Sequence, residues 1–225
     1  MNGDWYKIIS EALRVLGAII IAARPSSAEG DMFVGSFNYT PLVPVIYAAL
    51  IPRLEMLDID QEIKECSIQT VGKLISHFGD ALTSEMHTVM TLLRRRLDNE
   101  ITRIPTLRAI CTIASSPLQL DLSGFVTESI VEISCYVRQQ NRILKQTTLQ
   151  VIDALALHNS ASMPPELAAI VLKEVSYLLS DSDLALTHLA LRTVIDLYSK
   201  IPAAAEVSIQ IRAKCSFATL FSYGL

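Results

Sequence analysis

The 225-residue chain has few of the residues that build disulfide scaffolds, turn-rich sheets or strongly charged surfaces. Its four cysteines, at 66, 111, 135 and 215, form no C-x-x-C pair, so neither a disulfide framework nor a zinc knuckle is indicated. Only 8 glycines, 9 prolines and 6% aromatic residues argue against a β-sandwich. A formal charge of -4 provides no basic field for nucleic acid or an anionic membrane. We therefore expect an intracellular all-α protein with neither of those partners.

Sequence signatures of catalysis and of membrane insertion are also missing. The longest apolar run, Val15–Ala23, has nine residues, whereas a bilayer span needs about 20. No glycine-rich phosphate loop occurs, and no base and orienting acid accompany a cysteine. No i, i+4 metal pair is formed by the histidines, which are His77, His87, His158 and His188. We expect no catalytic residue, no cofactor, no metal and no small-molecule substrate, and hence a protein that is not an enzyme.

What is present is a repeated pattern. A small residue precedes an apolar anchor, and further apolar residues follow the anchor at three and six positions, as in Ser67, Ile68, Val71 and Leu74. The anchors are Leu13, Ile68, Leu107, Leu149 and Leu191, at intervals of 55, 39, 42 and 42 residues. The last three intervals lie in or next to the range of about 40–47 residues that is typical of two-helix HEAT or armadillo units.

Each repeat is predicted to be an antiparallel helical hairpin. Eight residues before the last four anchors stand side chains that cap helices, namely Asp60, Asn99, Asn141 and Asp183. The helix that carries the anchor is the second helix of each hairpin. The first helix comes from an apolar-periodic segment that lies between the copies, at 42–56, 82–97, 125–137 and 165–179. One more first helix is expected at 207–220. One hairpin cannot bury both of its apolar faces, so stacking is required. We expect an α-α superhelix, a HEAT/armadillo-like solenoid of about four full hairpins plus half-repeats at both ends.

The long first interval has a visible cause. The stretch RPSSAEGDMFVGSFNYT, rich in Gly, Ser, Pro and Asn, reads as an inserted loop at 24–41. Apart from this loop, the pattern predicts a single solenoid segment over residues 1–225. Because both ends leave apolar faces without a neighbouring hairpin, we expect an excerpt of a longer solenoid.

Two sets of polar residues keep the register of the repeat. One position after the anchor, opposite the apolar face, stand Arg14, Gln69, Arg108, Gln150 and Arg192. They form either a solvated face or a protein-binding surface, since stacked second helices line the concave side of such solenoids. Four positions before the anchor stand Lys64, Arg103 and Lys145, with Thr187 in the last copy. These cations lie near the apolar face, so we expect each to pair with a capping Asp or Asn.

The basic run Arg94–Arg96 has two interpretations. Asp98 and Glu100 follow it directly, which favours local neutralisation at the end of a helix. Docking of an acidic partner is the alternative.

Several segments resemble a known family. DIDQEIKECSIQTVGKLISHFGDAL, RLDNEITRIPTLRAICTIASSPLQLDLS, NRILKQTTL and LLSDSDLALTHLAL look like the middle of the CAND family, the cullin-associated, neddylation-dissociated proteins. The resemblance covers roughly residues 6–197. It implies a HEAT solenoid that wraps around an unmodified cullin and its RING partner, promotes exchange of substrate receptors, and resides in cytoplasm and nucleus.

Two other functions stay open at this stage. The chain has the pattern expected of any HEAT-repeat adaptor, such as a nuclear transport receptor or a phosphatase scaffold. An enzyme built on helical hairpins has only the scattered Cys and His residues in its favour.

Overall fold

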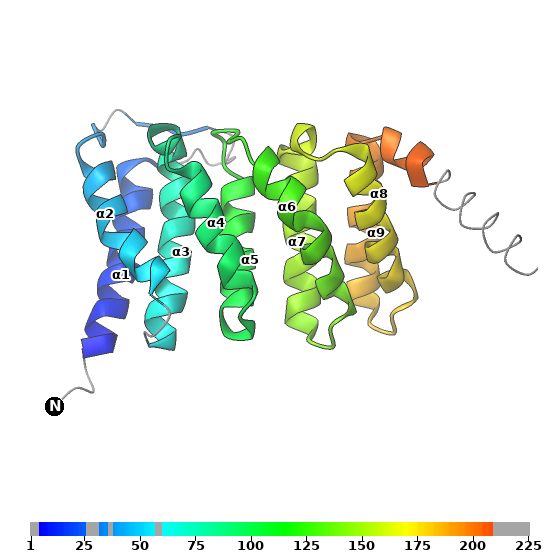
Figure 1. Cartoon of the computed structure of the whole chain (residues 1–225), viewed down its shortest axis with the longest axis horizontal. Helices are drawn as coiled ribbons and strands as arrows, with labels where there is room; N and C mark the ends of the chain where they lie inside the picture. Colours follow the sequence, from blue (N-terminus) through cyan, green and yellow to red (C-terminus); the bar gives the residue numbers. More distant parts are fainter. Residues whose placement is uncertain (1–4, 26–31, 36–37, 57–59, 209–225) are drawn as a thin grey trace, which may run out of the picture. The chain divides into compact units, whose positions relative to one another are not determined.

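A computed structural model describes residues 5–25, 32–35, 38–56 and 60–208, and within these ranges the secondary structure is helical, with no strand. The chain divides into two compact units, Met1–Phe125 and Val126–Leu225. The α-helices are shown in Figure 1 and are α1 (Trp5–Ala23), α2 (Leu42–Glu55), α3 (Gln61–Phe78), α4 (Met86–Leu97), α5 (Glu100–Ala114), α6 (Ser123–Cys135), α7 (Arg142–His158), α8 (Pro165–Ser176) and α9 (Leu184–Lys200).

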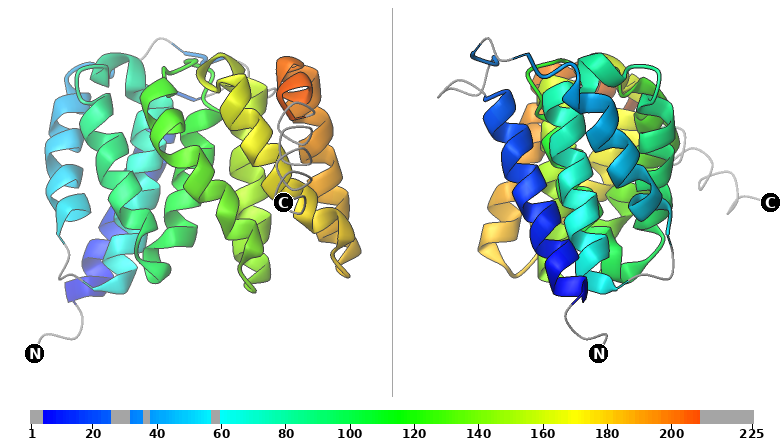
Figure 2. Two further views of the ribbon diagram at one scale, coloured as in Figure 1. Left: turned by 45° about the vertical axis from the view of Figure 1, so that its right-hand side comes forward. Right: turned by 90° about the vertical axis from the view of Figure 1, so that its left-hand side faces the viewer.

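The first unit has two layers of helices. In one layer α1 packs on α3, and α3 packs on α5. In the other layer α2 covers α3, α4 covers α5, and α2 touches α4. The views in Figure 2 show the same order, with α2 and α4 on one side of α3 and α5. This regular progression of helical hairpins confirms the predicted all-α, HEAT-like fold.

The second unit repeats this plan. Helix α7 packs on α9, and α8 covers α9. Short 3₁₀ segments extend the first helices, namely η2 (Tyr136–Arg138) after α6 and η4 (Tyr177–Ser180) after α8. The predicted first helix at 207–220 lies largely outside the described residues, although residues 203–208 are helical.

The four predicted capping residues are all found at the starts of second helices. Asp60 Oδ1 accepts a hydrogen bond from the Glu62 amide at 2.8 Å, and Asn99 accepts one from Ile101 at 2.9 Å. Asn141 and Asp183 cap α7 and α9 in the same way. Such caps satisfy amides that have no partner within the helix, so they fix where each second helix begins.

One first helix begins later than predicted. Helix α4 starts at Met86 and not at Leu82, because a 3₁₀ segment, η1 (Gly79–Leu82), and a turn precede it. Leu82 is nevertheless buried. The apolar pattern at Leu82 therefore reflects a buried side chain of the 3₁₀ segment and not a residue of α4. Pro165 stands in the first turn of α8, as predicted.

The inserted segment 24–41 connects α1 to α2, and Arg24 holds its described residues to the end of α3. The Arg24 guanidinium donates to the His77 carbonyl and to Asp80, at 2.7 Å each. It also lies over the rings of Phe33 and Tyr39, with 4.5 and 4.9 Å to the ring centroids. Cation–π contacts and charge-assisted hydrogen bonds therefore converge on one side chain.

Candidate protein-binding face

The residues one position after each anchor, here called the polar row, are all exposed. In the first unit they stand on α1, α3 and α5, and in the second unit on α7 and α9. The members are Arg14, Gln69, Arg108, Gln150 and Arg192. The face opposite the core thus has the orientation that helical periodicity predicted.

Arg14 is held by two carboxylates. Its guanidinium pairs with Glu11 of the same helix and with Glu62 of α3, the latter at 2.5 Å. The hydrogen bond that Arg14 donates to the Glu62 carboxylate raises the pKa of Arg14 above its ordinary value. This cation is therefore compensated within the chain, and it links two successive repeats.

Arg192 adjoins a pair of acids between α7 and α9. Its Nε lies 3.7 Å from Asp196 Oδ2. Asp153 of α7 faces the same place, and burial raises the pKa of its carboxyl to about 6, assisted by the Asp196 charge and opposed by a Thr193 hydrogen bond. Desolvation favours the neutral form of a carboxyl group, which explains this shift.

Arg103 and Thr187, which stand four positions before their anchors, bind carbonyls of the preceding turn. Arg103 donates to the carbonyls of Leu97 and Asp98, at 2.8 and 3.3 Å. Thr187 hydroxyl donates to the carbonyls of Leu178 and Asp181. These bonds go to carbonyls at the end of the preceding helix that have no partner within it, where a capping Asp or Asn had been expected for Arg103.

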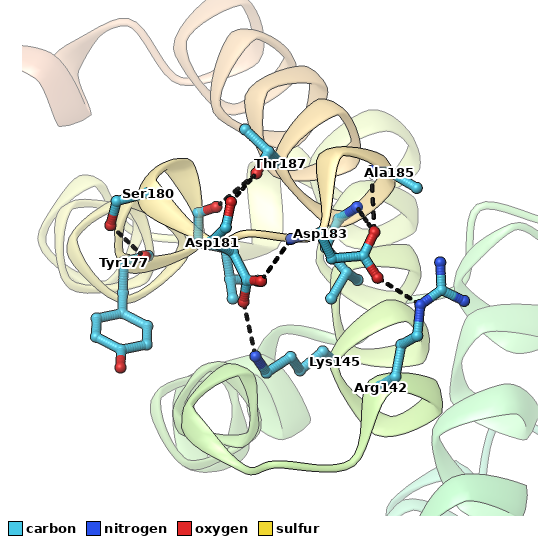
Figure 3. Close-up of polar contacts among 10 residues, drawn as sticks. Arg142, Lys145, Tyr177, Ser180, Asp181, Asp183, Ala185 and Thr187 are labelled. Atoms are coloured by element: carbon cyan, nitrogen blue, oxygen red, sulfur yellow. Dashed lines mark hydrogen bonds and ion pairs between the residues drawn. The ribbon is translucent and has the colours of Figure 1, made fainter.

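Lys145 comes nearest to the predicted arrangement. It donates to Asp181 at 2.8 Å, and Asp181 in turn accepts from the amide of the capping residue Asp183 (Figure 3). Arg142 binds Asp183 itself at 2.5 Å. The Lys145 and Arg142 side chains lower the pKa values of Asp181 and Asp183 respectively. The first turns of α7 therefore hold the loop that leads into α9.

Arg96 corrects the interpretation of the basic run. Its side chain is buried and donates to the carbonyls of Leu54 and Met56 at the end of α2, the latter at 2.6 Å. A cation at a helix C-terminus is favoured by the helix dipole. Arg96 thus joins α4 to α2, whereas Asp98 and Glu100 had been expected to neutralise it. Arg94 and Arg95 are exposed.

A pocket of about 410 Å³ opens between the start of α4 and the segment that leads into α6. Its wall is largely apolar, and His87 and Asp121 stand at its polar edge. The apolar lining comes from Met86, Met90, Leu120, Leu122 and Phe125. Asp121 accepts from the Ser123 amide at 2.9 Å and so helps to start α6.

Neither a metal-binding cluster nor a membrane-spanning helix is found among the described residues. Within the described ranges, no three His, Cys, Asp or Glu side chains are grouped so as to hold a metal ion. In the same part of the chain, no helix has both the length and the hydropathy for a bilayer span. Within each unit, the exposed residues of the polar row stand on successive packed helices.

Sequence reasoning missed the ion pairs between repeats. Arg138 pairs with Glu174 at 2.5 Å, and its partner lies 36 residues further along the chain. Lys145 and Asp181 have the same separation, and Arg142 and Asp183 are 41 apart. Opposite charges separated by about one repeat interval were the signal that would have found them.

Comparisons with known proteins agree on one family. A family model described as "CAND1-like, TPR repeats" matches residues 1–71. Cullin-associated NEDD8-dissociated protein 1 of Arabidopsis thaliana is 37% identical over 210 residues, which cover 93% of this chain and 17% of that protein. The Dictyostelium discoideum protein of that name is 31% identical over 98% of this chain and 17% of its own length. Cullin-associated NEDD8-dissociated protein 2 of Mus musculus is 35% identical over 83% of this chain and 15% of its own.

Proposed function

Because the chain belongs to the family of cullin-associated NEDD8-dissociated proteins, we propose that it is a cullin-binding scaffold segment. In this proposal it associates with a cullin and its RING subunit while the cullin carries no NEDD8. It acts by binding and not by catalysis. The single observation that supports the proposal is similarity along 93% of the chain to a relative named for cullin association.

The chain spans 17% of the length of the first relatives that it matches, so this segment contributes only part of the contact area such a protein offers. We assign the contact to the polar row, and within the first unit to Gln69 and Arg108. Both are exposed on successive second helices, α3 and α5. Side chains repeated in this way give a partner a row of contacts at a fixed spacing.

The family resemblance extends the proposal to regulation. Binding of unmodified cullin competes with the adaptor and its substrate receptor, so the protein promotes exchange of receptors among ubiquitin ligases. The cytoplasm and the nucleus are the compartments that this role requires.

The test is a pull-down with the immobilised 225-residue chain and two purified samples of one cullin–RING complex, with and without NEDD8. We expect recovery of the unmodified complex in preference to the modified one. Equal recovery of both samples, or recovery of neither, contradicts the proposal. Bovine serum albumin and an unrelated HEAT-repeat protein of similar charge serve as controls for nonspecific adsorption.

A further inference from the structure

The first unit presents two cations that have no acidic partner among the described residues. Arg108 stands in the polar row on α5, and Lys73 stands on α3 four positions after Gln69, on the same side of that helix. This side of α3 and α5 is here called the polar-row face. In the described ranges, neither Lys73 nor Arg108 forms an ion pair, whereas Arg14 on α1 is compensated by two carboxylates.

The Lys73 side chain lies across α1, where Gly17 leaves room for it. A Cβ placed on Gly17 would stand 3.0 Å from Lys73 Nζ and 3.2 Å from Lys73 Cδ. Because position 17 has no side chain, the stem and the ammonium group of Lys73 rest against the α1 backbone. A side chain that is already held in place loses less entropy when a ligand binds to it.

The positive charge of Lys73 acts at the C-terminal end of α3. His77 stands there, one turn after Lys73, and its pKa is lowered. Burial is the main cause, the hydrogen bond to the Arg24 carbonyl opposes it, and the charges of Arg24 and Lys73 lower the pKa further. Asp80 is paired with Arg24 and not with Lys73. The field around Lys73 is therefore positive and favours an anion.

An exposed isoleucine shares the polar-row face of α5. Ile101 precedes Arg108 by seven positions, so two helical turns bring both side chains to the same side of the helix. Isoleucine is among the residues that are most often buried, yet Ile101 is 53% exposed. A rise of 1.5 Å per residue places the two positions about 10 Å apart along the helix.

Two acids on α3 limit the length of an anionic ligand. Glu62 and Glu65 precede Gln69 by seven and four positions, so they share the polar-row face nearer the start of the helix. Glu62 pairs with Arg14, and Glu65 accepts a hydrogen bond from Gln61. A long polyanion on this face would meet these carboxylates, and the formal charge of -4 provides no general attraction for it. A short acidic segment avoids them.

We propose that the polar-row face of α3 and α5 binds a short, extended, acidic segment of the protein partner. Its carboxylates pair with Lys73 and Arg108, and an apolar side chain of the segment covers Ile101. An extended chain rises about 3.3 Å per residue, so the apolar residue follows the last carboxylate by about three positions. Packed helices lie about 8–10 Å apart, so two acidic residues reach both cations. The inference rests on the proposed function for the identity of the partner.

Titration of the ¹⁵N-labelled 225-residue chain with a peptide, followed by NMR, tests this inference. The probe is acetyl-Glu-Glu-Ser-Ser-Leu-amide, and the matched probe has two lysines in place of the glutamates. We expect the acidic peptide to shift the amide signals of Lys73, Arg108 and Ile101, with an affinity that falls as the salt concentration rises. The basic peptide is expected to leave these signals unchanged.

Three variants test the individual contacts. Lys73→Glu and Arg108→Glu are each expected to weaken binding of the acidic peptide about fivefold, because an attraction becomes a repulsion. Ile101→Ser removes the apolar contact and is expected to have an effect of about the same size. The control is Arg95→Glu, the same change of charge at an exposed site on α4, and it is expected to bind like the wild type. Circular dichroism checks that each variant folds.

The inference is overturned if both peptides shift the same signals equally, or if the acidic peptide shifts only signals of other helices or none. An oligonucleotide that binds more tightly at the same signals indicates a phosphate ligand and overturns it as well. The pull-down separates this inference from the proposed function. Recovery of the cullin–RING complex without peptide binding contradicts the inference alone, and peptide binding without recovery of the complex contradicts the proposed function alone.

Discussion

Gly72 of α3 lies directly against Ala109 of α5, so closely that a Cβ on Gly72 would stand 2.9 Å from the Ala109 Cβ and 3.0 Å from its Cα. The obstacle is backbone and a short side chain, neither of which moves aside easily. The spacing of two successive repeats therefore depends on the absence of a side chain at this position.

We expect Gly72→Ala to lower the free energy of unfolding by about 1–3 kcal/mol, because overpacking forces α3 and α5 apart. Urea denaturation measures the change. The matched control is Gly124→Ala in the first turn of α6, where an added Cβ meets nothing within 4 Å. That variant is expected to be neutral or more stable by up to about 1 kcal/mol, owing to the higher helix propensity of Ala. An equal loss in both variants would contradict the packing argument.

Arg96→Met tests the link between α4 and α2. The substitution removes the guanidinium and leaves the Leu54 and Met56 carbonyls without their buried donor. We expect this loss to destabilise the fold by about 2–3 kcal/mol. Thermal and urea unfolding give the value. Arg95→Met, at the exposed neighbouring position, is expected to change stability by less than about 0.5 kcal/mol. If both variants unfold at the wild-type midpoint, Arg96 does not stabilise the end of α2.

The buried carboxyl of Asp153 is expected to make the stability of the fold depend on pH. Its carboxyl has a pKa of about 6 in the folded chain, above the value of about 3.9 in an unfolded chain. The folded state therefore holds this proton more tightly, and the contribution of Asp153 to stability falls as the pH rises from about 4 to about 6, with no further loss above that range. The charged groups that face it are Asp196 and Arg192.

Asp153→Asn removes this titration. We expect the variant to gain stability over the wild type as the pH rises through that window, reaching about 1 kcal/mol near neutral pH after solvent screening of a partly exposed group. Urea denaturation at a series of pH values measures the difference. A difference that is constant between pH 4 and 7 would rule out this assignment.

The polar row is tested by reversing one charge. If the face on α5 contacts a cullin–RING complex, Arg108→Glu is expected to weaken binding about tenfold, mainly through a slower association rate. Biolayer interferometry at two salt concentrations measures both rate constants. Arg95→Glu makes the same change on α4, outside the polar row, and is expected to bind like the wild type. Unaltered affinity in Arg108→Glu would place the contact elsewhere.

Local signals in the sequence were sufficient for the capped helix starts and for the exposed row. Asp60 and Asn99 cap the helices that they were predicted to cap, because the bond from a capping side chain reaches only two or three residues. The exposure of Gln69 and Arg108 follows from the helical period alone. Neither inference requires knowledge of the tertiary arrangement.

The partners of buried polar groups were not predictable in the same way. Arg96 binds carbonyls about 40 residues upstream, and its nearest acids in sequence, Asp98 and Glu100, suggested a local pair. Arg103 likewise found carbonyls where a capping side chain had been expected. Free carbonyls at helix ends carry no mark in the sequence, since every residue type has one. The start of α4 was missed because Leu82 is buried outside the helix.

The clamp that Arg24 forms with His77 and Asp80 has a consequence for evolution of the insertion. Phe33 and Tyr39, which flank the guanidinium, fasten two points of the connection to the same spot. Residues between fixed points can be gained or lost at small entropic cost, because closure entropy grows only with the logarithm of loop length. We therefore expect changes in the length of this connection to leave the register of the next hairpin unaltered.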